Sequence, residues 1–264
     1  MTYRSTLFRL IGGVLTAAAI HAAPAAAQGP SFASYSEADR AAPRLRAPSD
    51  PAGARVYQAA MKAQGKRLLV SVDERWLWLL SGRDTLLSIP VAVGMNQDFV
   101  YDGKSFRFET PRGIRKVRGK AENPVWTPPD WHYYEKAVRQ GLTPVQLVDG
   151  DYFELSDGRA IEVRDNVVGR INEFGNWMPW TPGMEMIFDG MIFIPPMQSP
   201  QRRVPDALGP RKLDMGDGYL LHGTHLYNSE SIGQAVSHGC VRLPNDYLVI
   251  LYDLVPVGTP VYIF

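Results

Sequence analysis

The chain has 264 residues, of which 45% are hydrophobic and 11% aromatic, enough for one large domain, or one domain with an insertion, around a core. These proportions exclude a disordered chain, and 28 basic against 27 acidic residues give no basic excess that would indicate a nucleic-acid partner. The 24 glycines and 21 prolines recur between short apolar runs, which favours a mainly β protein of short strands and turns.

The first 27 residues have the order of a secretory signal peptide. Arg4 and Arg9 precede an apolar stretch over residues 10–20, and three consecutive alanines follow before Gln28. A membrane anchor is the alternative, but the apolar stretch is shorter than the roughly 20 residues that a spanning helix needs. We expect cleavage near Gln28, a location in the periplasm or cell envelope, and no stable membrane insertion afterwards. Without Arg4 and Arg9 the chain keeps 26 basic and 27 acidic residues.

After the cleavage site, residues 28–50 lack apolar periodicity and are expected to be a flexible lead-in, and residues 51–66 are expected to form a short helix. From residue 67 onward, short apolar runs alternate with turn residues, which indicates strands. Strands are expected at 68–72, 76–80, 86–93, 160–163, 186–194, 219–221 and 259–264. A hairpin is expected between 145–148 and 152–155 around Asp149 and Gly150, and a helix from Asn245 or Asp246 to about 253.

The residues that carry chemistry are concentrated between residues 220 and 245. This segment holds Cys240, the only cysteine of the chain, and three of the five histidines. An exported protein usually pairs its cysteines, but Cys240 has no partner within the chain. A cysteine nucleophile reacts as its thiolate and needs a nearby imidazole or positive charge, which His222, His238 and Arg242 can supply. The segment therefore predicts a cysteine active site.

The spacing leaves two candidate bases open. His238 lies two residues from Cys240, so on an extended segment both side chains point to the same face. His222 ends the apolar run at residues 219–221, and a strand could bring it beside Cys240. Gly239 permits a tight turn whose backbone N–H groups could receive an oxyanion, and Arg242 could bind a substrate carboxylate.

Two other interpretations compete with the cysteine active site. The spacing His222-x-x-His225 together with His238-x-Cys240 supplies ligand types that zinc accepts, although not in the spacing of a common zinc module. Alternatively, Cys240 and the histidines are ordinary buried residues. So many polar side chains around Gly223 and Gly239 would make a poor core segment.

The same residues resemble the signature of the L,D-transpeptidase catalytic domain, the YkuD family. The resemblance lies in the sequence 222–224, His-Gly-Thr, then a gap of 14 residues from Gly223 to Val236, then Ser-His-Gly-Cys-Val-Arg at 237–242 and Asn245. Weaker similarities occur at residues 90–94, 110–113, 123–129 and 208–210. The resemblance covers about residues 67–130 and 190–264, and the part between does not match the family pattern.

The resemblance implies a fold and a set of roles. It implies a mainly β catalytic domain over residues 67–264, a β-sandwich or partly closed barrel with a few short helices, with an inserted α+β subdomain at about 130–205. It implies that Cys240 is the nucleophile, that His222 accepts and donates the proton, and that His238 and Gly239 support the oxyanion hole. It assigns Ser237, Arg242 and Asn245 to the pocket or to substrate binding, and it implies no metal or organic cofactor.

The implied reaction is peptidoglycan cross-linking. Cys240 would form a thioester with one stem peptide, and an amine of a second stem would release it. The same residues would serve an L,D-carboxypeptidase, or a hydrolase that releases a wall-anchored protein. A non-catalytic wall-binding module is a third hypothesis, for which a missing nucleophile or base would be the expected sign. The insertion is rich in aromatic residues, so we expect either a lid over the substrate or the core of a small subdomain.

Overall fold

A computed structural model describes residues 43–264 of the chain, so the expected signal peptide and most of the lead-in lie outside the described residues. The described part is mainly β, with three α-helices, and its sheets do not close into a barrel. The predicted β-sandwich is therefore confirmed in its open form.

The first sheet is built around the start and the end of the described chain. Its strand order is β3-β2-β1-β20-β7, and β1 pairs antiparallel with β2 and parallel with β20. The bounds of these strands are β1 Lys66–Ser71, β2 Trp76–Ser81, β3 Asp84–Pro90, β7 Gly113–Lys116 and β20 Pro260–Ile263. β1, β2 and β3 correspond to the strands expected from residue 68 onward, and their antiparallel pairing makes them a meander.

Alternation along β1 shows why this sheet is covered on both faces. Leu68 and Val70 point into the main core, whereas Leu69 points to the other side, where α2 (Pro51–Lys62) packs. Asp50 caps this helix by accepting a hydrogen bond of 2.7 Å from the amide of Gly53. The helix ends four residues earlier than expected, because Lys66 already belongs to β1.

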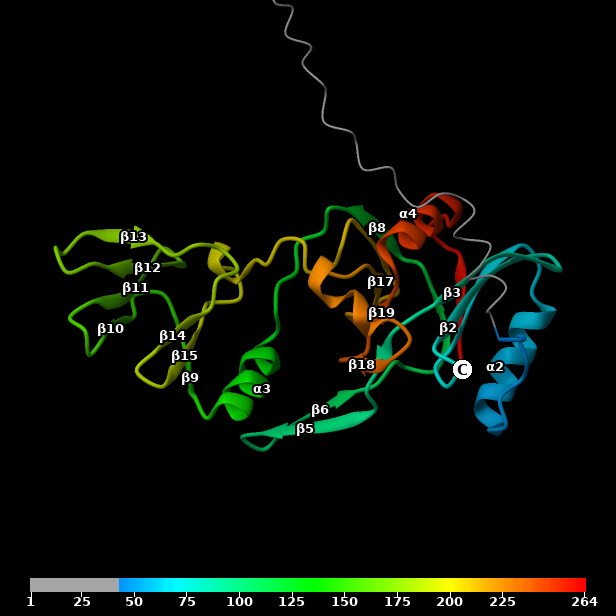
Figure 1. Cartoon of the computed structure of the whole chain (residues 1–264), viewed down its shortest axis with the longest axis horizontal. Helices are drawn as coiled ribbons and strands as arrows, with labels where there is room; N and C mark the ends of the chain where they lie inside the picture. Colours follow the sequence, from blue (N-terminus) through cyan, green and yellow to red (C-terminus); the bar gives the residue numbers. More distant parts are fainter. Residues whose placement is uncertain (1–42) are drawn as a thin grey trace, which may run out of the picture.

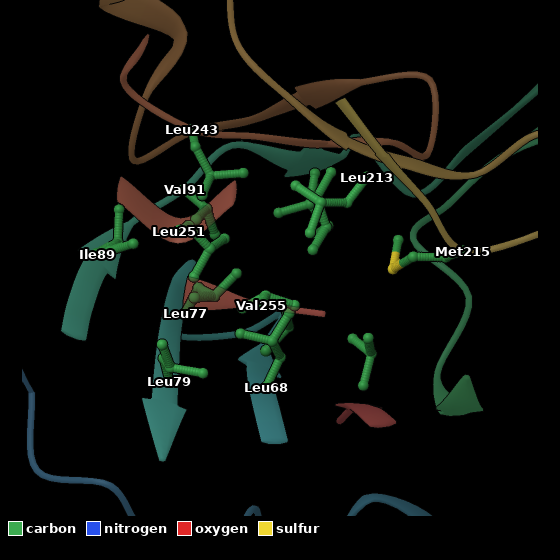
Figure 2. Packing of buried hydrophobic residues seen from close by; sticks show 14 of the residues in the cluster. Leu68, Leu77, Leu79, Ile89, Val91, Leu213, Met215, Leu243, Leu251 and Val255 are labelled. Atoms are coloured by element: carbon green, nitrogen blue, oxygen red, sulfur yellow. The ribbon is translucent and has the colours of Figure 1, made fainter. Parts of the chain in front are cut away.

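The second sheet contains both ends of the segment between residues 220 and 245. Its order is β19-β17-β16-β8, with bounds β8 Gly119–Glu122, β16 Arg211–Asp214, β17 Leu220–His222 and β19 Val241–Arg242. The helix α4 (Asn245–Leu254) follows β19 and contributes Leu248 and Leu251 to the same core. Figure 2 shows apolar side chains from both sheets and from α4 meeting in this core. Burial of this cluster holds the two sheets together and so fixes β17 and β19 in place.

Two short pairs complete this part of the fold. β4 (Val93–Gly94) pairs in parallel with β18 (Ala235–Ser237), which directly precedes the Cys240 segment. β5 (Gln97–Tyr101) and β6 (Lys104–Phe108) form a hairpin that the sequence did not predict, around a turn at Asp102 and Gly103. A 3-10 segment, η2 (Leu226–Ser231), lies between β17 and β18.

The residues between 130 and 205 have cores of their own. The β10-β11-β12-β13 sheet packs its apolar side chains against the three-stranded sheet β14-β15-β9. The bounds are β9 Thr143–Gln146, β10 Tyr152–Glu154, β11 Ala160–Arg164, β12 Val167–Ile171, β13 Trp177–Pro179, β14 Met186–Phe188 and β15 Met191–Ile194, followed by the 3-10 turn η1 Pro200–Arg202. Figure 1 shows β10–β13 at the opposite end of the molecule from α2.

One helix of residues 130–205, the part expected from the sequence to be an insertion and called the inserted part below, faces the rest of the molecule. It is α3 (Asp130–Gln140), which packs Tyr133 and Ala137 against β15 and lies beside the β5–β6 hairpin. The half-buried Tyr134 of α3 stacks on Tyr101 of β5, with ring centres 4.6 Å apart. Figure 1 shows α3 next to this hairpin. The inserted part is therefore attached to the sandwich by a defined contact.

Two sequence expectations within the insertion are wrong in detail. The hairpin between residues 145–148 and 152–155 does not form, because β9 pairs in parallel with β15 and β10 pairs with β11. The apolar run expected as one strand over 186–194 is a hairpin, with Asp189 and Gly190 both at positive φ in its turn.

Candidate active site

His222 ends β17, and Cys240 directly precedes the neighbouring strand β19. β17 and β19 are parallel, with Leu221 opposite Val241 and His222 opposite Arg242. Leu221 and Val241 are fully buried in the core, so the two-residue period of a strand turns His222 and Arg242 to the other face. Cys240, one residue before β19, belongs to that same face, and its Sγ lies 3.8 Å from the carbonyl oxygen of Gly218. The fold thus places a thiol, an imidazole and a guanidinium together.

The surroundings favour the neutral forms of both the thiol and the imidazole. Burial raises the pKa of the Cys240 thiol above its ordinary value of 9.0, with a further rise from Asp214, while the backbone at Leu220 and the charge of Arg242 lower it. Burial lowers the pKa of His222 to about 4, and Arg242 lowers it further. At neutral pH, His222 is therefore an unprotonated imidazole that can accept a proton.

The Nδ1 atom of His222 is buried inside the protein. It meets no hydrogen-bond partner of normal geometry within residues 43–264. Backbone groups of Gly223 and Leu208 nevertheless lie close enough to the ring to raise the pKa of the imidazole. The family resemblance also implies that the backbone carbonyl of Gly223 orients this ring, and that role stays a prediction.

The segment that presents Cys240 is braced by two hydroxyl groups. Ser237 Oγ donates to the carbonyl of Cys240 at 2.6 Å and accepts from the amide of Gly239 at 3.1 Å. Thr110 Oγ1 donates to the carbonyl of Gly239 at 2.9 Å and accepts from the amide of Gly94 at 2.8 Å. The sequence did not assign Thr110 a role, although the turn at 110–113 was part of the family resemblance. These bonds tie β4, β18 and the turn that follows β6 to the Cys240 segment.

Gly239 has a conformation and surroundings that only glycine fits. Its φ is 129°, and a Cβ at this position would lie 2.8 Å from the ring of Tyr219 and 2.9 Å from the carbonyl oxygen of Glu109. A side chain there would push the Cys240 segment away from β6. The tight turn expected at Gly239 is therefore present.

Asn245 holds the backbone that follows His222. Its Oδ1 accepts from the amide of Thr224 at 2.9 Å, and its Nδ2 donates to the carbonyl of Thr224 at 3.0 Å. Both polar ends of the Asn245 side chain are thus used within the protein. A Cβ on Gly223 would lie 2.1 Å from Asn245 Oδ1, so the glycine permits this contact.

His238 turns toward the inserted helix. Its Nε2 lies 3.0 Å from a carboxylate oxygen of Glu135 on α3, and its ring contacts Trp131 and Phe108 at centroid distances of 4.6 Å and 4.5 Å. Burial lowers the pKa of His238, while Glu135 raises it. Of the two candidate bases, His222 points to the same face of the β17–β19 pair as Cys240, whereas His238 is hydrogen-bonded to Glu135 of α3.

The zinc alternative finds no support in this geometry. His225 caps η2 by accepting from the amide of Tyr227 at 3.3 Å and is exposed. No group of three or more His, Cys, Asp or Glu side chains in the described part of the chain is arranged to hold a metal ion. In the same part of the chain, no helix is long and apolar enough to cross a membrane.

A cavity of about 570 Å³ lies beside the site. Gly94 and Thr110, which brace the Cys240 segment, form part of its wall, together with Ala235 of β18. The charged residues of the wall are Asp73, Arg75, Glu109 and Arg112. Cys240 and His222 do not line it, so the cavity adjoins the segment from the side of β4 and β6.

A mainly β sandwich that holds a half-buried cysteine beside a buried neutral histidine has the residue types of a cysteine-based acyl-transfer site. The chain belongs to the L,D-transpeptidase catalytic domain family (YkuD), whose pattern matches residues 65–263. This membership confirms the resemblance found in the sequence.

Three relatives illustrate the similarity. The probable L,D-transpeptidase YbiS of Escherichia coli (strain K12) is 39% identical over 83 residues, 31% of this chain and 26% of that protein. The probable L,D-transpeptidase ErfK/SrfK of Salmonella typhimurium (strain LT2) is 31% identical over 142 residues, 48% of this chain and 44% of that protein. Each match thus spans less than half of the relative. The L,D-transpeptidase crystal structure from Xylanimonas cellulosilytica (residues 123–326) superposes with a TM-score of 0.41 at 17% identity, covering 81% of this chain and 70% of that chain.

Proposed function

We propose that the protein is a periplasmic peptidoglycan L,D-transpeptidase that forms cross-links through a thioester on Cys240. The observation that carries the proposal is the register of β17 and β19, which sets His222 and the cysteine segment on one face next to Arg242. The signature residues of the family occupy these positions, and the neutral state of His222 suits a general base.

The first half of the reaction makes the thioester. His222 takes the thiol proton of Cys240 as the sulfur attacks the carbonyl that follows the L centre of the donor stem. The carbonyl oxygen becomes an oxyanion, which backbone N–H groups near Gly239 and Cys240 receive. The C–N bond then breaks, and the terminal D-alanine leaves as an amine with the proton held by His222. Because the imidazole starts neutral, it can carry that proton between the two steps.

The second half transfers the acyl group. An amine of a second stem attacks the thioester, His222 removes its proton, and the Cys240 sulfur leaves and is reprotonated. Water in place of the amine gives the L,D-carboxypeptidase that is the alternative function, with the same residues. The charge of Arg242 lowers the pKa of Cys240, and we assign its guanidinium to binding a substrate carboxylate.

The hydrogen bonds of the site suggest how the remaining residues act. Ser237 and Asn245 use their polar atoms on the protein backbone, so we assign them to holding the segments of Cys240 and His222. The insertion at 130–205 contacts the Cys240 segment through His238, which supports a role as a lid or substrate cradle. Unchanged turnover after deletion of residues 131–204 would refute that role.

The test of the proposal is mass spectrometry of the purified protein with defined disaccharide tetrapeptides. The wild type should give an acyl adduct on Cys240 and a cross-linked dimer, and Cys240→Ala should give neither. His222→Ala should lose acylation, whereas His225→Ala, a matched histidine outside the strand pair, should keep it. Tripeptide without dimer would favour the carboxypeptidase, and product from Cys240→Ala would overturn the mechanism.

A further inference from the structure

The contact between His238 and Glu135 joins two parts of the chain that lie 103 residues apart in sequence. His238 is next to Gly239 and Cys240, whereas Glu135 sits on α3 in the inserted part. Both side chains are about 25% exposed, so the hydrogen bond between them is largely shielded from water. A shielded, charge-assisted hydrogen bond is stronger than an exposed one.

The ring of His238 is also held by two aromatic side chains. Trp131 of α3 lies against it at 4.6 Å with a 31° angle between the ring planes, and Phe108 meets it edge-on at 4.5 Å and 84°. Phe108 and Trp131 contact each other at 4.9 Å. The imidazole thus has a partner on each side and a carboxylate at Nε2, which leaves its ring one orientation.

The helix that delivers Glu135 is firmly anchored. Arg202, fully buried, binds the carboxylate of Asp130 at the start of α3 and donates to the carbonyls of Pro128 and Pro195 at 2.7 Å and 2.9 Å. Tyr134 stacks on Tyr101 of the β5–β6 hairpin. Glu135 therefore meets His238 from a fixed position.

The charge of Glu135 decides which nitrogen of His238 carries a proton. An ionised carboxylate only accepts hydrogen bonds, so Nε2 must be the protonated nitrogen, and Nε2–H donates to Glu135. The other charged or titratable groups that act on His238 are Arg139 and His132 on α3 and Arg242 on β19. Glu135 is the group among them that favours the protonated ring.

We propose that Glu135 is a positioning residue of the active site, whose carboxylate fixes the tautomer and orientation of His238 and so the backbone that presents Cys240. The inference rests on the proposed function. It makes the inserted helix α3 part of the active-site structure, through a contact that the sequence pattern of the Cys240 segment does not contain.

The test compares Glu135→Ala with Glu135→Gln, measuring D-alanine release from a disaccharide tetrapeptide and the ring nitrogens of His238 by NMR. Glu135→Ala removes the hydrogen bond, so we expect kcat to fall about 10- to 100-fold, with KM changed less than about threefold. The Gln side chain in Glu135→Gln can accept from Nε2–H but also donate to the other tautomer, so kcat should lie between the values of Glu135→Ala and the wild type. In both variants, His238 should titrate at lower pH than in the wild type, because the carboxylate no longer favours the protonated ring.

Glu185→Gln is the matched control. Glu185 pairs with Lys136, also on α3, but does not touch His238. This variant loses an ion pair of the same helix and should keep the wild-type kcat and the wild-type His238 titration.

Wild-type kcat in Glu135→Ala, or a His238 titration that does not move in Glu135→Gln, would overturn the inference. Failure of the wild type to release D-alanine would instead count against the proposed function. In that case, the NMR comparison still decides whether Glu135 holds the His238 ring.

Discussion

The ionisation of Cys240 gives the sharpest test of the site. Many cysteine enzymes keep the thiolate ready as an ion pair with a protonated histidine. In this protein, burial raises the pKa of the thiol and lowers the pKa of His222 to about 4, so the resting pair is neutral at pH 7. We predict that Cys240 becomes a thiolate only as the substrate binds and His222 takes its proton.

The raised pKa of the Cys240 thiol sets how steeply its alkylation rate should depend on pH. A thiol whose pKa lies above 9.0 is less than about 1% ionised at pH 7, and its ionised fraction grows about tenfold for each pH unit below the pKa. The rate of alkylation of Cys240 by iodoacetamide should therefore rise about 100-fold between pH 6 and pH 8. Turnover should keep its acid limb near pH 4, where His222 becomes protonated, and not near the ordinary histidine value of 6.5.

The assay is alkylation followed by intact-mass measurement in buffers from pH 5 to 9. Arg242→Gln should slow alkylation at pH 7, because the positive charge that lowers the pKa of the thiol is gone. His222→Asn should alkylate at nearly the wild-type rate but lose acylation by the tetrapeptide. The two readouts thus separate the reactivity of the sulfur from proton transfer.

One result would refute the reasoning. An alkylation rate that is already level between pH 6 and pH 8 would mean that a thiolate and an imidazolium coexist in the resting protein. The neutral pair deduced from burial would then be wrong, and Arg242 or an unseen rearrangement would have to supply the missing charge compensation.

Three further predictions concern stability. Asn245→Ala should lower the free energy of unfolding by about 2–4 kcal/mol in denaturant titration, because two hydrogen bonds to buried Thr224 are lost, and a change below about 0.5 kcal/mol would contradict this role. Gly94→Ala should destabilise the fold, since a Cβ would lie 2.5 Å from a backbone nitrogen, whereas Gly119→Ala, whose nearest neighbour is 3.9 Å away, should be tolerated; equal melting temperatures would refute this. In the folded protein, burial lowers the pKa of His132 from its ordinary value of 6.5 to about 4. As pH falls from 6.5 to 4, the unfolded chain takes up a proton that the folded protein does not, so stability is lost. His132→Gln should reduce that loss by up to about 3 kcal/mol, measured by denaturant titration at both pH values.

The sandwich was predictable because its strands are local patterns. The runs at Lys66–Ser71, Trp76–Ser81 and Pro260–Ile263 are apolar and bounded by turn residues, which marks them as strands buried on both faces. What no local pattern contains is pairing between distant segments. β1 pairs with β20 across almost the whole described chain, and β9 pairs with β15 and not with its neighbour β10. The turn residues at Asp149 and Gly150 favoured the nearer partner, and burial of β9 against β15 decided otherwise.

The candidate site likewise contains residues that the sequence could indicate and residues that it could not. Cys240 and His222 could be chosen from the sequence, because few residue types can perform thiol chemistry and their order matched a known signature. The supports of the site could not be chosen from composition or spacing alone. Thr110 binds the carbonyl of Gly239 from 129 residues away, and Glu135 binds His238 from 103 residues away. A threonine in a turn and a glutamate on a helix are ordinary residues until the fold brings them to the cysteine segment.

The two strands of the site and its supporting side chains differ in how substitutions can affect them. The core fixes β17 and β19, so the pairing of His222 with the Cys240 segment depends on apolar burial that surface changes do not reach. The supports at Gly239 and His238 come from a hairpin and from an inserted helix, both on the outside of the sandwich. Substitutions on α3 can therefore shift the backbone that presents Gly239 and Cys240, and with it the rate of reaction and the approach of the second stem, while β17 and β19 stay paired. Substitutions in residues 130–205 are accordingly expected to lower the rate or change the balance between transfer and hydrolysis, whereas substitution of Cys240 or His222 is expected to abolish the reaction.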